Sequence, residues 1–229
     1  MPWTLERGVC LEICRFSQPS PIAHRLPVAN SLESDAAWKI TYIETNILMK
    51  TAYYMNVLKG HNGSLERVGG LPSHLPPSFP ICPDTDQPMA FLLQIYCHPV
   101  RLPVPGALCL QLYQCRSVDN GDDPTPVLVR VPMGARENIQ AQGSISPLLE
   151  PHDIIWEVKE DPDEMPSSSP VEGGKYYRSK LGGVPTFESC LKGRRFLGQI
   201  AESPMGFNFG GVMAILMLDS NSNPILEMC

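Results

Sequence analysis

Eight cysteines and five histidines are the residues of this sequence that could ligate a metal or act in catalysis. Cys10 and Cys14 have one spacing found in zinc sites, and Cys97-His98 offers two more ligands. No second Cys-x-x-Cys or His-x-x-x-His pair completes a recognisable set. Neighbouring residues of a strand point to opposite faces, so Cys97 and His98 do not form a dyad. We therefore expect no metal, no cofactor and no enzymatic activity.

Other reactive patterns are also missing from the sequence. No Gly-x-Ser-x-Gly elbow is present. The glycine pairs at 69–70 and 182–183 are too short for a phosphate-binding loop. The basic run 192–195 is interpreted as a solvated turn. One enzymatic alternative stays open, a cysteine-dependent reaction that uses Cys82, Cys97 or Cys109.

The composition predicts many short strands rather than a helix bundle. Proline occurs 24 times and glycine 18 times in 229 residues, which implies frequent turns. The longest apolar run, 210–218, is too short to span a membrane. The N-terminus lacks a secretory apolar region, so we expect a cytoplasmic protein. The cysteines lie partly in apolar runs such as 108–110, and we expect reduced thiols.

Acidic residues are concentrated in two places. The net charge of −6 argues against nucleic acid as a partner. Eight acids and Lys159 give the two clusters a charge of −7, so the remainder of the chain is close to neutral. We interpret the clusters as loops that either attract a charged partner or are simply solvated. The first contains Asp119, Asp122 and Asp123, and the second contains Glu157, Glu160, Asp161, Asp163 and Glu164.

Hydrophobic patterning predicts one helix and six strands. Apolar residues from Ile40 to Leu58 fall at helical spacing, with Ser34 or Asp35 as the cap, so a helix is expected over most of 36–58. Residues 67–88 are expected to be mostly loop, and 161–174 a mobile linker. Nearly continuous apolar runs predict strands at 89–97, 106–115, 127–131, 154–158, 195–200 and 212–218.

An internal repeat is the strongest pattern in the sequence. Val-Gly-Gly-Leu-Pro at 68–72 recurs as Leu-Gly-Gly-Val-Pro at 181–185. Each copy is followed by a Phe-Leu-x-Gln-Ile run, and the intervals from Gln94 to Gly106 and from Gln199 to Gly211 are both 12 positions. Paired glycines permit positive φ or a close backbone approach. A buried glutamine must satisfy its amide, so we expect each one to tie the glycine loop to its strand, with a ligand-facing role as the alternative.

This doubled pattern resembles the YwqG-like proteins, a bacterial domain family of unknown function. The resemblance covers about 65–219, and Cys82 stands where relatives carry a cysteine pair, although no partner cysteine follows it. It implies an α+β, mainly β fold in which two degenerate repeats, at about 67–132 and 179–219, form one pseudo-twofold domain. That domain would span 65–229. The resemblance does not explain residues 1–64, which we expect to form a helix-containing segment packed on the domain.

The family resemblance, rather than composition, is the origin of the functional expectation. Some relatives are encoded beside antibacterial toxins, including type VI secretion effectors, and look like immunity proteins. We expect this chain to bind and neutralise such a toxin by occluding its active site, which in a nuclease would be basic. The two acidic clusters would supply charge complementarity, and Trp156 is a candidate anchor, with a core role as its alternative. A small-ligand-binding module is the alternative function.

Overall fold

The computed structural model describes residues 51–60, 63–116, 124–137, 147–162, 177–203 and 205–229. Contacts between Cα atoms group the chain into two units, 1–39 and 40–229. The first unit lies outside the described residues, as do the proposed helix caps Ser34 and Asp35. The second unit contains all of the described residues.

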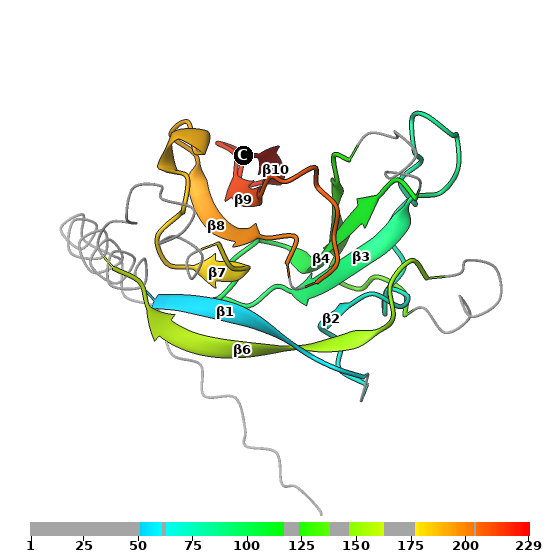
Figure 1. Ribbon diagram of the computed structural model, residues 1–229, viewed down its shortest axis with the longest axis horizontal. Helices are drawn as coiled ribbons and strands as arrows, with labels where there is room; N and C mark the ends of the chain where they lie inside the picture. Colours follow the sequence, from blue (N-terminus) through cyan, green and yellow to red (C-terminus); the bar gives the residue numbers. More distant parts are fainter. Residues whose placement is uncertain (1–50, 61–62, 117–123, 138–146, 163–176, 204) are drawn as a thin grey trace, which may run out of the picture. The chain divides into compact units, whose positions relative to one another are not determined.

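Among the described residues, ten strands make up almost all of the regular structure (Figure 1). A short 3₁₀ turn, η2 (Glu188–Cys190), precedes β8. No helix in the described part of the chain is long and apolar enough to cross a membrane. The strands are β1 (Thr51–Leu58), β2 (Arg67–Val68), β3 (Ala90–Tyr96), β4 (Ala107–Gln114), β5 (Val127–Pro132), β6 (His152–Glu160), β7 (Lys180–Gly182), β8 (Arg195–Ile200), β9 (Ala214–Leu218) and β10 (Pro224–Met228).

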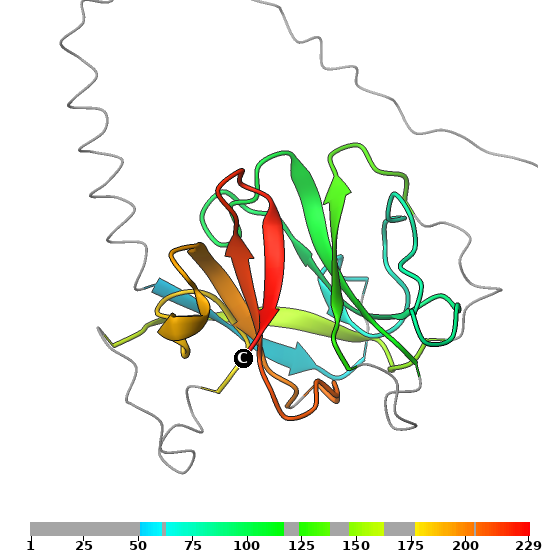
Figure 2. The ribbon, with the colours of Figure 1, turned by 90° about the horizontal axis from the view of Figure 1, so that it is seen from above.

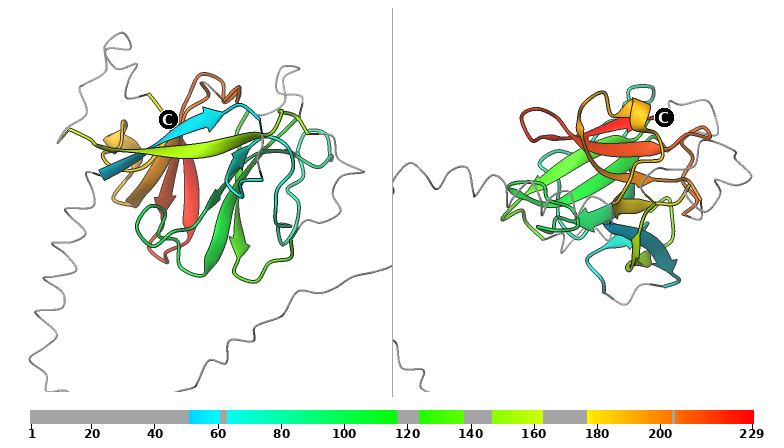
Figure 3. Two further views of the ribbon diagram at one scale, coloured as in Figure 1. Left: turned by 90° about the horizontal axis from the view of Figure 1, so that it is seen from below. Right: turned by 90° about the vertical axis from the view of Figure 1, so that its left-hand side faces the viewer.

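All ten strands belong to one antiparallel sheet, so the expectation of a mainly β fold is confirmed. The order is β10-β9-β8-β7-β1-β6-β2-β3-β4-β5. The sheet curls strongly, and its end strands β10 and β5 approach each other (Figure 2). At its centre, the long strands β1 and β6 run side by side (Figure 3).

The predicted helix over 36–58 is wrong in its last eight residues, because Thr51–Leu58 is strand β1. This segment contains Thr51, Tyr53, Tyr54 and Val57, β-branched or aromatic residues that suit a pleated surface. Pairing with β6 on one edge and β7 on the other overrides the helical spacing. Residues 36–50 lie outside the described residues.

The six predicted strands correspond to β3, β4, β5, β6, β8 and β9. β2, β7 and β10 were not predicted. β2 and β7 have only two and three residues, too few to show a period. β10 keeps all five residues partly exposed, so it lacks the apolar run typical of a buried strand.

The two glycine pairs adopt the backbone conformation that the repeat suggested. Gly69 and Gly70 have φ of 69° and 67°, and Gly182 and Gly183 have φ of 64° and 70°. A side chain at Gly69 would also place its Cβ 2.3 Å from the carbonyl oxygen of Glu150. These positions therefore require glycine both for their dihedrals and for the close approach of neighbouring chain.

The main hydrophobic core lies inside the curled sheet. Side chains from both ends of the sheet enter it, together with Met55 and Ile154 from the central strands. Two loops complete it: one contributes Leu102 and Val104, and the other contributes Met205, Phe207 and Phe209. The interior is thus filled mainly by strand side chains and completed by residues of two loops.

Candidate functional site

Only part of the predicted partner-binding set can be placed. The first cluster, Asp119, Asp122 and Asp123, lies outside the described residues, as do Asp163 and Glu164 of the second. Glu157 and Glu160 lie on strand β6, not in a loop as predicted, and both are exposed. The strand extends further than its apolar run because β1 pairs with it as far as Glu160.

Asp161 is buried, so it does not contribute to an exposed acidic surface as predicted. Its carboxylate accepts hydrogen bonds from the Tyr54 hydroxyl at 2.6 Å and from the Val184 amide at 2.8 Å. It also forms an ion pair with Lys180, whose side chain is 0% exposed. The Lys180 ammonium donates a second bond, 2.7 Å long, to the Val184 carbonyl. Burial lowers the pKa of Lys180, while Asp161 opposes that shift.

The second glycine pair explains how the Asp161 carboxylate fits. A Cβ on Gly183 would lie 2.2 Å from Asp161 Oδ2. Because glycine has no side chain, the carboxylate fits there and accepts a hydrogen bond from the Val184 amide. The chain that was predicted to be a linker from residue 161 is therefore fixed to the sheet at its first residue.

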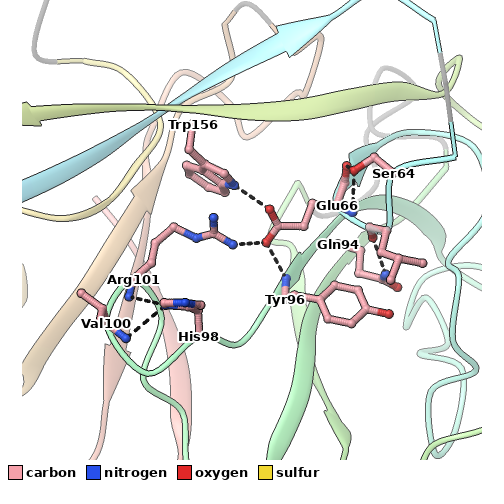
Figure 4. Close-up of polar contacts among 9 residues, drawn as sticks. Ser64, Glu66, Gln94, Tyr96, His98, Val100, Arg101 and Trp156 are labelled. Atoms are coloured by element: carbon pink, nitrogen blue, oxygen red, sulfur yellow. Dashed lines mark hydrogen bonds and ion pairs between the residues drawn. The ribbon is translucent and has the colours of Figure 1, made fainter. Parts of the chain in front are cut away.

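Trp156 is partly buried and engaged within the molecule (Figure 4). Its indole Nε1–H donates to Glu66 Oε2 at 2.6 Å. The Arg101 guanidinium lies over the indole, 4.6 Å from the ring centroid, and pairs with the other oxygen of Glu66. That same oxygen accepts from the Tyr96 amide at 3.0 Å. The alternative interpretation of Trp156 as a core residue thus agrees with its packing against the main core.

The outward face of β1 and β6 carries exposed apolar and charged side chains. Ile155 is 49% exposed and Leu58 46%. They are diagonal neighbours on one face, because Ile155 pairs with Asn56, two residues from Leu58. Glu157, on the same face, forms a 2.9 Å ion pair with Lys159. A hydrogen bond from Lys159 is the largest cause that lowers the pKa of Glu157.

The buried glutamines perform the structural role expected from the repeat. Gln94 Nε2 donates to the Leu65 carbonyl at 2.7 Å and to Ser73 Oγ at 2.5 Å. Both acceptors flank the first glycine pair, so the amide fixes that loop to β3.

Gln199 makes the corresponding contacts around the second glycine pair. Its Nε2 donates to the Arg178 carbonyl at 3.0 Å and to Thr186 Oγ1 at 2.9 Å. The Thr186 amide returns a bond to Gln199 Oε1 at 3.1 Å. The ligand-facing alternative has no support at either glutamine, because both are 0% exposed.

A polar network that the sequence did not suggest surrounds the first glutamine. Gln111 Nε2 donates to Gln94 Oε1 and to the His74 carbonyl, both at 2.8 Å. The Tyr113 hydroxyl donates to Gln111 Oε1 at 2.8 Å. The Tyr96 hydroxyl lies 2.7 Å from His74 Nδ1. Gln111 and Tyr113 alternate along β4 and therefore share a face, which is the one sequence signal that could have predicted their contact.

The expectation of reduced cysteines is contradicted for four of them. Cys82 pairs with Cys115, and Cys190 pairs with Cys229, as disulfides. The folded chain brings together residues 33 and 39 positions apart, which sequence patterning could not predict. The Asp84 carboxylate lies close enough to the Cys82 and Cys115 sulfurs for the three to hold a metal, but only with the disulfide reduced.

The remaining described cysteines, Cys97 and Cys109, have free thiols. Burial raises the pKa of both to about 12, so at neutral pH almost none of either is the reactive thiolate. His98 Nδ1 accepts the amides of Val100 and Arg101 and so closes a turn. Cys10 and Cys14, the other zinc candidates, lie outside the described residues.

No protein-family model matches this sequence, and no curated protein was found to be similar to it.

Proposed function

We propose that this chain is a protein-binding module that acts as an immunity protein. It would bind a cognate antibacterial toxin, such as a type VI secretion effector, and cover the toxin's active site. The observation that carries the proposal is the exposed part of the outward face of the two central strands, since Ala52 and Tyr54 on that face are buried. Ile155 and Leu58 form an apolar spot there, and Glu157 and Lys159 place charges beside it.

This arrangement suits protein recognition better than small-molecule chemistry. Interfaces commonly have an apolar centre inside a polar rim, and a few central residues carry most of the affinity. Here Ile155 and Leu58 would be the centre. Glu157 and Glu160 belong to the rim, where acidic groups speed association with a basic surface such as a nuclease cleft. Trp156 and Asp161 would act indirectly, by holding β6 in place from within.

We further propose that the segments 67–132 and 179–219 are two copies of one unit, related by a pseudo-twofold axis between β1 and β6. Three observations support this relation. The strand order reads outward from the β1–β6 pair as β7-β8-β9 on one side and β2-β3-β4 on the other. The bulges in β3 and β8 follow Phe91 and Phe196, 105 positions apart. Gln94 and Gln199 make matching bonds to their glycine loops.

Of the two other functions expected from the sequence, the cysteine-dependent enzyme has the weaker support. Its candidate nucleophiles are Cys82, which is in a disulfide, and the two free thiols with raised pKa values. A small-ligand-binding role stays a prediction, which thermal shifts with metabolite pools would test.

The experiment is co-expression of this chain with the product of the neighbouring gene. We expect that product to be toxic alone, to be neutralised by this chain, and to co-purify with it. Ile155→Glu should abolish rescue, because it places a charge at the apolar centre of the face. Ile81→Glu is the matched control, since Ile81 is 50% exposed but lies outside β1 and β6. A neighbouring product that is harmless, or that remains toxic and unbound, would contradict the proposal.

A further inference from the structure

Strand β6 has an edge that is only partly paired. Along one edge it pairs with β1 from Asp153 to Glu160. Along the other edge it pairs with β2 through His152 and Asp153 alone, because β2 has only two residues. Within the described ranges, no strand pairs with this second edge from Trp156 to Glu160.

The direction of the backbone groups along this edge follows from one hydrogen bond. The Ile154 amide donates to the Glu66 carbonyl, on the β2 side, at 3.1 Å. Backbone groups in an antiparallel strand alternate in direction, so those of Trp156, Val158 and Glu160 point the same way. An edge of this kind presents a row of donors and acceptors to any extended chain that approaches it.

The side chains beside the edge indicate which chain would fit. Val158 is 61% exposed, so an apolar side chain of an added strand would cover it. Trp156, on the same strand face, is already covered by the Arg101 guanidinium. Glu157 and Glu160 are exposed on the two faces of β6. Lys159 pairs with Glu157, and the Arg178 guanidinium lies 4.0 Å from the same carboxylate. Glu160 accepts a hydrogen bond from the Thr51 hydroxyl and pairs with no cation among the described residues, so its charge favours a basic chain.

We propose that the Trp156–Glu160 edge of β6 is a docking site for an extended, basic segment of the partner protein, which adds to the sheet as a short strand. The inference rests on the proposed protein-binding function and specifies how the partner is held. Main-chain hydrogen bonds to Val158 and Glu160 supply affinity, as in other strand-addition complexes, and the Glu160 carboxylate selects lysine or arginine.

The test uses the full chain and an eight-residue peptide of alternating valine and lysine, with a valine–glutamate peptide as control. Titration of the ¹⁵N-labelled protein should shift the amide signals of Trp156, Val158 and Glu160 with the first peptide alone. Val158→Pro removes one edge donor without breaking the β1 ladder, since proline is tolerated at unpaired edge positions. We expect it to weaken peptide binding at least about tenfold, the effect of losing roughly 1.4 kcal/mol. Val158→Thr keeps the amide and a similar shape, and should bind like the unmodified protein.

Three results would overturn the docking site: equal binding by Val158→Pro and Val158→Thr, equal binding of the acidic peptide, or shifts confined to other strands. If light scattering shows that the unmodified chain is dimeric and the Val158→Pro variant is monomeric, a second copy of the chain occupies the edge instead. These outcomes are separable from failure of the proposed function. If the neighbouring product binds Val158→Pro normally, the immunity role stands and the edge is not its site.

Discussion

The two ends of the sheet contain the same loop motif, but different side chains surround it. In each, a Gly-Gly-x-Pro loop is tied to the next strand by a glutamine that is 0% exposed. Opposite Gln94 stands Gln111, whereas opposite Gln199 stands Ile215. The first region, 65–132, therefore contains a hydrogen-bonded network beside its own apolar cluster around Phe91, whereas in the second, 178–229, the residue opposite the glutamine belongs to an apolar cluster.

The same contrast extends along the neighbouring strands. Tyr113 faces Phe91 in the first region and Met217 faces Phe196 in the second. Phe187 follows Thr186 at the position where His74 follows Ser73. The comparison indicates that glutamine is required at this position because its side chain must hydrogen-bond the glycine loop. The residues around it have only to satisfy one another, with polar or with apolar contacts.

The two regions also differ in how they bind the cation that precedes each glycine pair, and the largest loss of stability is expected here. Lys180 is fully buried against Asp161, whereas Arg67, on β2, bonds the Leu71 carbonyl and is partly exposed. We expect Asp161→Ala to destabilise the fold by about 3–5 kcal/mol in urea unfolding, because a buried ammonium loses its partner. Adding Lys180→Met should recover most of that loss.

A matched control lies next to Asp161 in the sequence. Glu160 is exposed, and Glu160→Ala should change stability by no more than about 0.5 kcal/mol. An Asp161→Ala variant as stable as Glu160→Ala would show that the carboxylate does not hold the end of β6 to the sheet.

The disulfides test whether the two regions are stabilised alike. One bridge lies in each, and they close loops of similar length. Removal of either, by Cys82→Ala with Cys115→Ala or by Cys190→Ala with Cys229→Ala, should cost about 2–4 kcal/mol under oxidising conditions. Thermal unfolding with and without reductant measures this. If the double variants lose no more stability under oxidising than under reducing conditions, the cysteines do not pair in solution.

A double-mutant cycle asks whether the network of the first region acts as a unit. Gln94→Leu and Gln111→Leu should each destabilise the protein, but their combination should cost less than the sum by about 1–3 kcal/mol, since the two amides bond each other. Gln94→Leu combined with Gln199→Leu, which share no partner, should be additive within about 0.5 kcal/mol. Additive behaviour of the first pair would remove the distinction between the regions.

The smallest expected effect concerns β10 at the end of the second region. Glu227 receives hydrogen bonds from Lys192 and Arg194, and that from Lys192 is the largest cause lowering its pKa. A carboxyl with a lowered folded-state pKa stabilises the fold above its ordinary value of 4.5, and that contribution disappears as pH falls through the folded-state pKa. Glu227→Gln should therefore be slightly less stable than the unmodified chain at pH 7 and equal to it at pH 2. A difference independent of pH would exclude the charge as its cause.

Sequence alone predicted what depends on continuous patterns. The buried strands β3, β4, β8 and β9 appear as apolar runs, and the glycine pairs and glutamines appear through their spacing. The sequence predicts a helix where β1 lies, because the apolar residues there also fit a helical period, and only pairing with β6 and β7 decides between the two.

The candidate site was less accessible from sequence because its contacts join distant segments. Asp161 opens a stretch rich in acid, serine and proline, and nothing local shows that Tyr54, 107 positions earlier, donates to it. Glu66 and Trp156 are likewise 90 positions apart. A cation two residues before each glycine pair, Arg67 and Lys180, was the available hint that a buried counter-ion was needed.

Hydrogen exchange along β6, measured by NMR on the free, full-length protein, tests most directly the claim that this strand offers an open edge to a partner. The amides of Val158 and Glu160 should exchange quickly, while those of Glu157 and Lys159, which point toward β1, should be protected, and addition of the partner should slow the first pair alone. Slow exchange at Val158 and Glu160 before any partner is added would show that the edge is already covered, and would contradict its role as a docking site.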